Sequence, residues 1–337
     1  MKKKRITLRN TGTNEDENLQ YNFTLEQAFD YFVSAKKAEG TRKNTVRIYY
    51  ENFGIFSKWF RNEYPDYTKA NDLTTPIIRE YLNYLKEERF NLKTKEYGLS
   101  DQTLNARLRF LKTFYNFLHK EDIVSENPAE KIKLIRMDER KFTPLTEEEM
   151  VRLMSIPDKK QYPQFRDFVL MNLLYDTAMR IFEAVHITVD DLDLKGRRIL
   201  LPAEITKGRK TRIIPLSNHV IKLLIELISE NEANFENKSI FLNWYGEQLN
   251  EDTFRRNLKR YLNKANIDKQ FSCHDFRRQS ITEMLKNGAS IWAVQSICGH
   301  SQITTTKKYV HFDEQTIKNQ HELYSPVVKM RINNKRK

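Results

Sequence analysis

Apolar side chains recur at helical spacing through the first third of the chain. Thr24 and Gln27 have the spacing of a capping box, and the stripe that starts at Leu25 marks one buried helix face. Three further segments carry stripes of the same kind, formed by Val46, Tyr49, Phe53, Phe56, Phe60, Ile78, Leu82, Leu85, Leu104, Leu108, Leu111, Tyr115 and Leu118. Four helices of this length can close around one core, so residues 22–124 are predicted to form a four-helix domain.

Local signals indicate where several of these helices begin. Thr75-Pro76 is expected to supply the N-cap and the first-turn proline of the third helix, and Ser100 is expected to open the fourth. A second capping box, at Thr146–Glu149, is expected to start another domain. The chain has only 9 Gly and 9 Pro in 337 residues, which favours helices with few breaks.

Two short runs in the second half have the character of β-strands instead. Arg198–Pro202 and Arg212–Leu216 flank the basic, turn-forming tip Lys207–Lys210. A small antiparallel hairpin is therefore predicted within an otherwise helical domain. The fold class is predicted to be mainly α, with this hairpin as its β component (α+β).

Changes in composition predict the domain boundaries. Residues 1–21 are polar and aperiodic and are expected to form a flexible basic arm ahead of the 22–124 bundle. Residues 125–143 are highly charged and are expected to be a linker. The second domain is expected to span residues 144–318, and residues 319–337 are expected to be a basic tail.

The charge balance favours a polyanionic partner. Lys and Arg number 58 against 45 acidic residues, which gives a formal net charge of +13. Neutralising phosphates with such cations releases condensed counterions and favours nucleic-acid binding, although RNA-binding and membrane-surface proteins share this excess. The two cysteines have no zinc or disulfide spacing, and no run of 18 apolar residues occurs. A cytoplasmic protein without metal, other cofactor or membrane span is expected.

Four small clusters carry residue types suited to chemistry on a phosphate. In the first, Arg180 precedes Glu183 by three residues, a pattern that an ordinary buried ion pair also explains. The second is the Lys207–Lys210 tip, which could equally be a solvated turn. Each of these patterns alone has little specificity.

The other two clusters lie further along the chain. His274 and Arg277 are three residues apart and would share one helix face, so both can reach the same anion. Gly299-His300 is followed nine residues later by Tyr309, although a tyrosine on a polar helix is more often a surface residue. The order of all four clusters carries more weight than any one of them.

That order, Arg-x-x-Glu, Lys-Gly, His-x-x-Arg, Gly-His and Tyr, resembles the tyrosine recombinases. This family includes phage integrases, Xer-like resolvases and transposon-borne integrases. The similarity covers residues 146–315, and the preceding bundle resembles the SAM-like core-binding domain of the family. The resemblance implies a site-specific recombinase that cleaves and rejoins DNA through a 3′-phosphotyrosine intermediate, without metal or ATP.

The resemblance also implies catalytic roles. Arg180 and Arg277 would neutralise the two non-bridging phosphate oxygens, because paired guanidinium N–H groups can stabilise that charge without a metal. Tyr309 would attack phosphorus and form the covalent intermediate. The phosphotyrosine bond would conserve the ester energy, so rejoining needs no further energy source.

The remaining positions would assist these three. Lys207 is expected to protonate the leaving oxygen as general acid, and Lys210 is the alternative candidate for this role. His274 is expected to act as base or hydrogen-bond partner, and His300 to donate to a phosphate oxygen. Glu183 is expected to orient Arg180 from behind.

Several positions depart from the family pattern without removing a catalytic group. Ala178 stands where a glycine is usual, and Phe182 where a small or polar residue is usual, so both are expected to crowd Arg180. Phe276, Arg278 and Cys298 replace a common Leu, His and Leu.

The resemblance implies a C-shaped clamp on double-stranded DNA recombination sites, with phosphate contacts supplying most of the affinity. The DNA-binding candidates in the first domain are Arg42, Lys43, Arg107, Arg109 and Lys112. A homo-tetramer on two sites is expected, with each C-terminal segment docking on its neighbour through Leu323 and Pro326. An accessory protein that sets direction is compatible with this, and the enzyme would act in the cytoplasm at the nucleoid.

Three other classes of function stay open at this point. A non-catalytic, sequence-specific DNA-binding regulator would keep the clamp and lack strand cleavage. A type IB topoisomerase would share the chemistry and relax supercoiled DNA without sequence requirement. A structural RNA-binding or membrane-binding protein is supported by charge alone.

Overall fold

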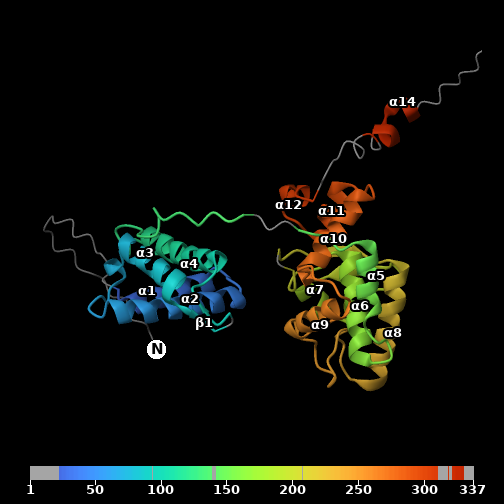
Figure 1. Ribbon diagram of the computed structural model, residues 1–337, viewed down its shortest axis with the longest axis horizontal. Coiled ribbons are helices and arrows are strands. Elements are labelled where there is room, and N and C mark those ends of the chain that lie inside the picture. Colours follow the sequence, from blue (N-terminus) through green and yellow to red (C-terminus); the bar gives the residue numbers. More distant parts are fainter. Residues whose placement is uncertain are drawn as a thin grey trace, which may run out of the picture. The chain divides into compact units, whose positions relative to one another are not determined.

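The chain folds into two compact units, with the boundary after residue 140, inside the segment predicted to be a linker. The computed structural model describes residues 23–92, 94–138, 142–206, 208–309, 318 and 321–329 (Figure 1). The predicted arm lies outside the described residues, as does most of the predicted tail. The two units are described separately.

The first unit contains the four predicted helices. They are α1 (Leu25–Ala38), α2 (Lys43–Glu63), α3 (Thr75–Asn83) and α4 (Asp101–Lys120). Shorter elements join them: η1 (Ala70–Asp72), a π-helical turn η2 (Tyr84–Glu88), and the antiparallel pair β1 (Phe90–Asn91) and β2 (Glu96–Tyr97). Two-residue strands are too short to show a period of two, and the stripe analysis did not predict them.

Side-chain caps account for two of the four helix starts in the first unit, those of α1 and α4. The Thr24 hydroxyl accepts from the backbone N–H of Gln27, whose side chain accepts from the Thr24 N–H in return. At the start of α4 the Ser100 hydroxyl accepts from the backbone N–H of Thr103. The expectation for α3 was wrong by one residue: Thr74 is the N-cap, and the Thr75 hydroxyl donates instead to the Pro128 carbonyl at 2.8 Å.

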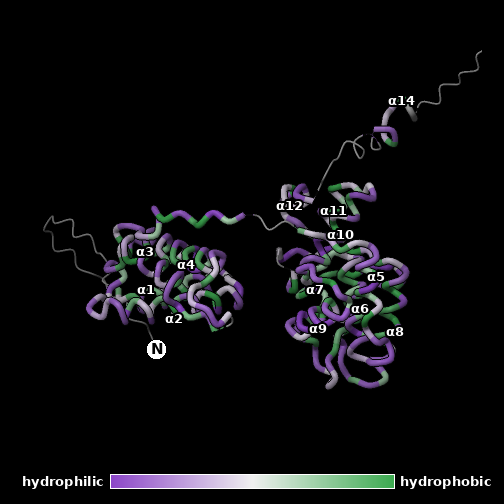
Figure 2. The backbone as a smooth tube through the Cα atoms, viewed as in Figure 1, coloured by the Kyte–Doolittle hydropathy of each residue, from purple (hydrophilic) through white to green (hydrophobic). Residues whose placement is uncertain are grey.

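The core of the first unit is unusually aromatic. The rings of Phe29 and Phe53 are stacked with centroids 3.8 Å apart, and Phe114 meets Phe29 edge-on. Hydrophobic and hydrophilic residues alternate along the helices, as the stripes predicted (Figure 2). Large rings bury much apolar area per residue, so a small bundle gains a stable core.

The segment after α4 is held on this bundle. Ala129 and Ile132 are buried against the core, and the Lys112 ammonium donates to the Ala129 carbonyl at 2.7 Å. The Asn105 side chain pairs with both backbone groups of Ile135 at 2.9 Å. The first half of the predicted linker therefore packs against the first unit.

The second unit is helical with one small sheet. Its helices are α5 (Glu147–Ser155), α6 (Tyr162–Thr177), α7 (Ile181–His186), η3 (Val189–Asp191), α8 (Asn218–Asn234), α9 (Glu251–Lys264), α10 (Cys273–Lys286), α11 (Ile291–Cys298), α12 (Ile303–Lys307) and α14 (Pro326–Lys329). The strands β3 (Leu192–Asp193), β4 (Arg198–Leu201) and β5 (Arg212–Pro215) form an antiparallel sheet in that order. The predicted hairpin is β4–β5, with Ile199 paired to Ile214.

Helix α6 forms the centre of this unit and packs against both α8 and α10. Its residues are buried on nearly every side, which is typical of a central helix. Helices α11 and α12 lie together at one end of the unit, and α8 and α9 reach towards the other (Figure 1). No helix within the described part of the chain is long and apolar enough to cross a membrane.

A buried polar network fixes α9 against α6. The Asp167 carboxylate accepts from Arg166 at 2.8 Å, from the Asn257 amide at 2.7 Å and from the Tyr261 hydroxyl at 2.9 Å. Arg166 also donates to the Leu242 carbonyl at 2.7 Å. Because buried charges are costly unless fully paired, this network sets one orientation for α9.

Candidate active site

Arg277 joins three separate segments of the second unit. Its side chain projects from α10 and is 2% exposed. The guanidinium donates to the Ala178 carbonyl at the end of α6 (2.7 Å) and to the Cys298 carbonyl at the end of α11 (2.9 Å). Burial lowers the pKa of Arg277 to about 10, so the group stays charged at neutral pH. A guanidinium has five N–H groups, which leaves donors for an anion.

Arg180 begins α7 and is paired with Glu183. One terminal nitrogen of Arg180 donates to Glu183 Oε1 at 2.9 Å, and the Arg180 backbone N–H donates to Oε2 at 3.0 Å. Glu183 is 1% exposed, whereas the Arg180 side chain is 29% exposed. Glu183 thus contacts Arg180 from the protein side, while part of the guanidinium faces solvent.

Arg212 is a third arginine at this site, which the sequence analysis treated only as part of a strand. Its terminal nitrogens donate to both Glu183 oxygens, at 3.2 and 2.7 Å. Burial raises the pKa of Glu183, but the hydrogen bonds and charges of Arg212 and Arg180 outweigh this and hold it below its ordinary value. The sequence signal was slight: an arginine that opens a strand just after a basic tip.

The two histidines lie in the field of these arginines. His300 follows α11, and its Nδ1 lies 2.8 Å from the Thr306 hydroxyl. Burial, then the charges of Arg277 and Arg180, lower the pKa of His300 to about 4. The pKa of His274 on α10 is lowered by partial desolvation and by the charge of Arg277. Both rings are therefore neutral at neutral pH.

The low pKa of His300 predicts a pH dependence of stability. The unfolded chain binds a proton at His300 near pH 6.5, whereas the folded chain does so only near pH 4. The unfolded state is therefore favoured as the pH falls through this window. Urea unfolding of the parent should show a free energy that declines from pH 6.5 to pH 4, and His300→Asn should flatten that decline. An equally steep decline in the variant would contradict the assignment.

Tyr309 lies just after α12 and packs against a small apolar cluster of Ala178, Ile281, Val294 and Cys298. Its backbone N–H donates to the Thr306 carbonyl at 3.1 Å. Two of those cluster residues, Ala178 and Cys298, are the ones whose carbonyls accept from Arg277. The predicted nucleophile therefore packs against a cluster that contains the two residues whose carbonyls hold Arg277.

The two predicted sources of crowding behave differently. The expectation for Phe182 was wrong: its ring is 42% exposed and stacks on His186 with centroids 4.1 Å apart, away from Arg180. Ala178 does adopt the left-handed conformation, with φ of 53°, which glycine adopts more freely. An L-residue there costs roughly 1–2 kcal/mol, so the backbone beside Arg277 and Arg180 is strained.

The hairpin tip is described only in part. Lys207 lies outside the described residues. Lys210 is exposed, and its backbone is tied to the Thr206 hydroxyl through both its N–H and its carbonyl, each at 3.1 Å. The choice between Lys207 and Lys210 as general acid stays a prediction.

The DNA-binding candidates of the first unit divide into two groups. Lys43 and Arg109 are exposed, and Arg42 is the partly buried N-cap of α2. Arg107 donates to the Asn52 amide oxygen at 2.7 Å, and Lys112 holds the segment after α4, as described above. Arg107 and Lys112 therefore have contacts within their own unit, and the exposed pair is better suited to a phosphate.

Helix α9 carries a basic face that the sequence analysis missed. Arg256, Lys259 and Arg260 are exposed and line a shallow cavity of about 530 Å³ together with Thr253 and Asn263. The cations recur at i, i+3 and i+4, a spacing that the sequence alone displays. This face is the most concentrated set of exposed cations described on α9 and suits a DNA backbone.

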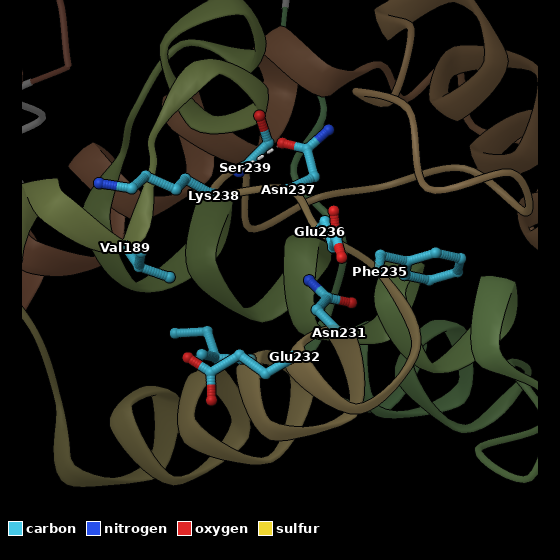
Figure 3. Close-up of a pocket in the computed structure, with 9 residues that line it drawn as sticks. Val189, Asn231, Glu232, Phe235, Glu236, Asn237, Lys238 and Ser239 are labelled. Carbon is cyan, nitrogen blue, oxygen red and sulfur yellow. Dashed lines mark hydrogen bonds between the residues drawn. The ribbon is translucent and has the colours of Figure 1, made fainter.

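A second cavity, of about 330 Å³, lies where α8 ends and the following segment turns back (Figure 3). Figure 3 shows Glu232 and Glu236 among its lining side chains, with Lys238 pointing away from them. Two carboxylates repel a phosphate, so this cavity is not part of the candidate site.

Comparisons with known proteins agree with the geometry. The model of the phage integrase family matches residues 143–316, and that of the phage integrase SAM-like domain matches residues 24–134. Tyrosine recombinase XerD of Staphylococcus epidermidis is 27% identical over 313 residues, which cover 90% of this chain and 99% of XerD. Tyrosine recombinase XerC of Chlamydia caviae is 30% identical over 238 residues, which cover 70% of this chain and 75% of XerC.

Solved structures share the fold. The Tn1549 transposon integrase in complex with circular intermediate DNA matches with a TM-score of 0.67 at 19% identity, covering 88% of this chain and 99% of the integrase chain. The chain belongs to the phage integrase family. Its enzyme class is tyrosine-type site-specific recombinase, and neither the regulator nor the topoisomerase alternative is favoured.

Proposed function

We propose that this recombinase cleaves and rejoins duplex DNA through a bond between Tyr309 and a DNA 3′-phosphate, with Arg180 and Arg277 binding the scissile phosphate. One observation carries the proposal. The buried Arg277 guanidinium is held by the carbonyls of Ala178 and Cys298, and Tyr309 packs against the apolar cluster that contains these two residues. Arg180 follows Ala178 by two residues.

The number of phosphate ester bonds stays the same in cleavage and in rejoining. The Tyr309 oxygen attacks phosphorus, the P–O5′ bond breaks, and the phenolic proton leaves to a base such as His274. The departing 5′ oxygen takes a proton from Lys207 and becomes a hydroxyl. In rejoining, a 5′-hydroxyl attacks the phosphotyrosine and releases the phenol. One ester replaces another at every step, so ATP is not required.

The arginines stabilise the charge that develops on the phosphate. Arg180 has a guanidinium that is partly open to solvent, and Arg277 has donors beyond the two that its carbonyl contacts use. Hydrogen bonds between two ionised groups are about twice as strong as neutral ones, and more so where water is excluded. His300, neutral and held by Thr306, is suited to donate a further hydrogen bond.

Binding to duplex DNA would rest on phosphate contacts. Arg42, Lys43 and Arg109 in the first unit and the basic face of α9 in the second supply exposed or partly exposed cations. A homo-tetramer on two recombination sites, docking through the segment that includes Leu323 and Pro326, is part of the proposal. So are action at the nucleoid and an optional accessory protein that sets direction.

Covalent capture without metal tests the proposal. The full chain is incubated in EDTA with fragmented genomic DNA of the organism that encodes it, then denatured, and protein-bound fragments are sequenced. We expect adducts to form in EDTA, because guanidinium groups rather than a metal neutralise the phosphate. They should lie at discrete sites, because the enzyme is a site-specific recombinase. Adducts that vanish in EDTA and return with Mg²⁺, or no adducts at all, would contradict the proposal.

The recovered sites allow a second test, of the general acid. A suicide duplex is built on a recovered site, with a nick just beyond the cleaved bond so that the short product diffuses away. Lys207→Ala should slow cleavage roughly 10²-fold or more while DNA affinity changes little. In a substrate with sulfur in place of the 5′ oxygen, the sulfur leaves without needing a proton. This substrate should therefore restore the cleavage rate of Lys207→Ala. Lys210→Ala is the matched control, and the opposite pattern would assign the role to Lys210.

A further inference from the structure

We propose that Arg212 is a positioning residue for both halves of the phosphate pocket, holding Arg180 through Glu183 and holding the end of α11, which carries His300. The inference rests on the proposed function, because it gives Arg212 a role in the same strand-cleavage reaction. Arg212 would not touch DNA itself.

All three nitrogens of the Arg212 guanidinium are engaged within the protein. Nη1 and Nη2 donate to the two oxygens of Glu183, and Nε donates to the Ile297 carbonyl at 3.1 Å. The side chain is 11% exposed, compared with 29% for Arg180. Each of the three guanidinium nitrogens thus already donates to a protein group, an arrangement suited to hold Glu183 and the end of α11 in place.

The contact with Glu183 governs how much of Arg180 is available. Glu183 is almost fully buried and receives hydrogen bonds from both arginines at both oxygens. Without Arg212, both oxygens of the buried carboxylate could pair with the Arg180 guanidinium and pull it inward. Alternatively, the carboxylate could take up a proton and lose its contact with Arg180. Either change would remove the geometry in which one side of Arg180 faces the protein and the other faces the phosphate.

The contact with α11 governs the other half of the pocket. Gly299 ends this helix with φ of 66°, and a Cβ built there would lie 3.0 Å from Arg212 Nη1. The guanidinium therefore packs directly under the turn. One residue earlier, the Cys298 carbonyl holds Arg277, and one residue later comes His300. Movement of this turn would displace both groups.

Arg212 also opens β5, the strand that follows the hairpin tip. The same side chain thus anchors the base of the hairpin that carries Lys207 and Lys210 to the arginine pocket. A single residue links the acid-bearing hairpin, the Arg180 pair and the α11 turn.

The test is a double-variant cycle on the suicide duplex. We expect Arg212→Gln to lower the single-turnover cleavage rate roughly 10²-fold while DNA affinity stays within about threefold of the parent. Glu183→Gln should cause a similar loss. Because the contact between Arg212 and Glu183 is already lost in Arg212→Gln, the double variant should be scarcely slower than Arg212→Gln. Arg198→Gln, on the neighbouring strand and paired with Asp193 at the surface, is the matched control and should cleave normally.

Each outcome decides the inference. The inference is overturned if the rate losses of the two single variants multiply in the double variant. It is also overturned if Arg212→Gln cleaves at the parent rate. If Arg212→Gln does not fold, Arg212→Lys replaces it, because an ammonium keeps the charge but cannot reach Glu183 and Ile297 together. A partial loss of rate is then expected, and full activity would overturn the inference. Absence of any adduct with the parent chain would instead refute the proposed function, not the role of Arg212 alone.

Discussion

Tyr309→Phe is expected to abolish covalent attachment to DNA and to leave DNA binding intact. Phenylalanine keeps the ring that packs against the cluster of Ala178, Ile281, Val294 and Cys298, so the local fold is preserved while the attacking oxygen is lost. Removing the nucleophile of a covalent enzyme lowers the rate by at least about 10⁴-fold. The measurement is denaturing electrophoresis of the suicide duplex, with gel shift of the same duplex for affinity.

A second tyrosine provides the matched control. Tyr245 is 84% exposed and lies between α8 and α9, so Tyr245→Phe should cleave at the parent rate. An adduct that persists in Tyr309→Phe would contradict the assignment of the nucleophile. Loss of the adduct in Tyr245→Phe instead would move the reaction to that residue.

Arg277→Lys is expected to lower the cleavage rate roughly 10³-fold although it keeps the positive charge. The guanidinium donates to two carbonyls on different segments, and a single ammonium cannot keep this forked arrangement. A carbonyl left without its partner in a buried site costs about 1–3 kcal/mol, so thermal stability should fall as well. Single-turnover cleavage and thermal unfolding measure the two effects.

The adjacent arginine separates position from charge. Arg278 lies over the Phe142 ring at 4.5 Å and pairs with Asp275 at 3.5 Å, away from the two carbonyls. Arg278→Lys should therefore retain most of the activity. Equal losses in the two lysine variants would indicate a general effect of α10 on folding and would contradict a specific role for Arg277.

Local signals predicted the elements of this fold well. The capping boxes at Thr24 and Thr146 each involve residues three apart, and each apolar stripe lies within a single helix. Neither signal depends on tertiary contacts. The β4–β5 hairpin was predicted for the same reason. The N-cap of α3 was misplaced by one residue because Thr74 and Thr75 are equally suitable, and a distant carbonyl, that of Pro128, engages Thr75.

Tertiary contacts explain what the sequence analysis missed at the site. Arg212 becomes part of it only because β5 lies beside α7 and α11, and no spacing along the chain reports that proximity. The supporting role of the Ala178 and Cys298 carbonyls is likewise invisible in a sequence, because every residue has a carbonyl. Phe182 was predicted to crowd Arg180 from its size alone, but its direction on α7 takes it to His186.

The contacts of the first unit refine the DNA-binding prediction in the same way. Arg107 and Lys112 have the residue type and helix face expected of phosphate contacts, yet both are engaged inside the bundle. Substituting Arg107 or Lys112 should lower the stability of the first unit and should change the salt dependence of DNA binding little. Exposed Lys43 and Arg109 are the stronger candidates for counterion release.

The most direct test of the central claim is to identify the atom that becomes attached to DNA. After reaction with the suicide duplex, nuclease and trypsin digestion would leave a short nucleotide on one peptide, and mass spectrometry would locate it. We predict a nucleotide joined through its 3′-phosphate to Tyr309, within the peptide that begins after Lys308. A nucleotide on any other residue, or one joined through its 5′-phosphate, would contradict a pocket in which two arginines present a phosphate to this tyrosine.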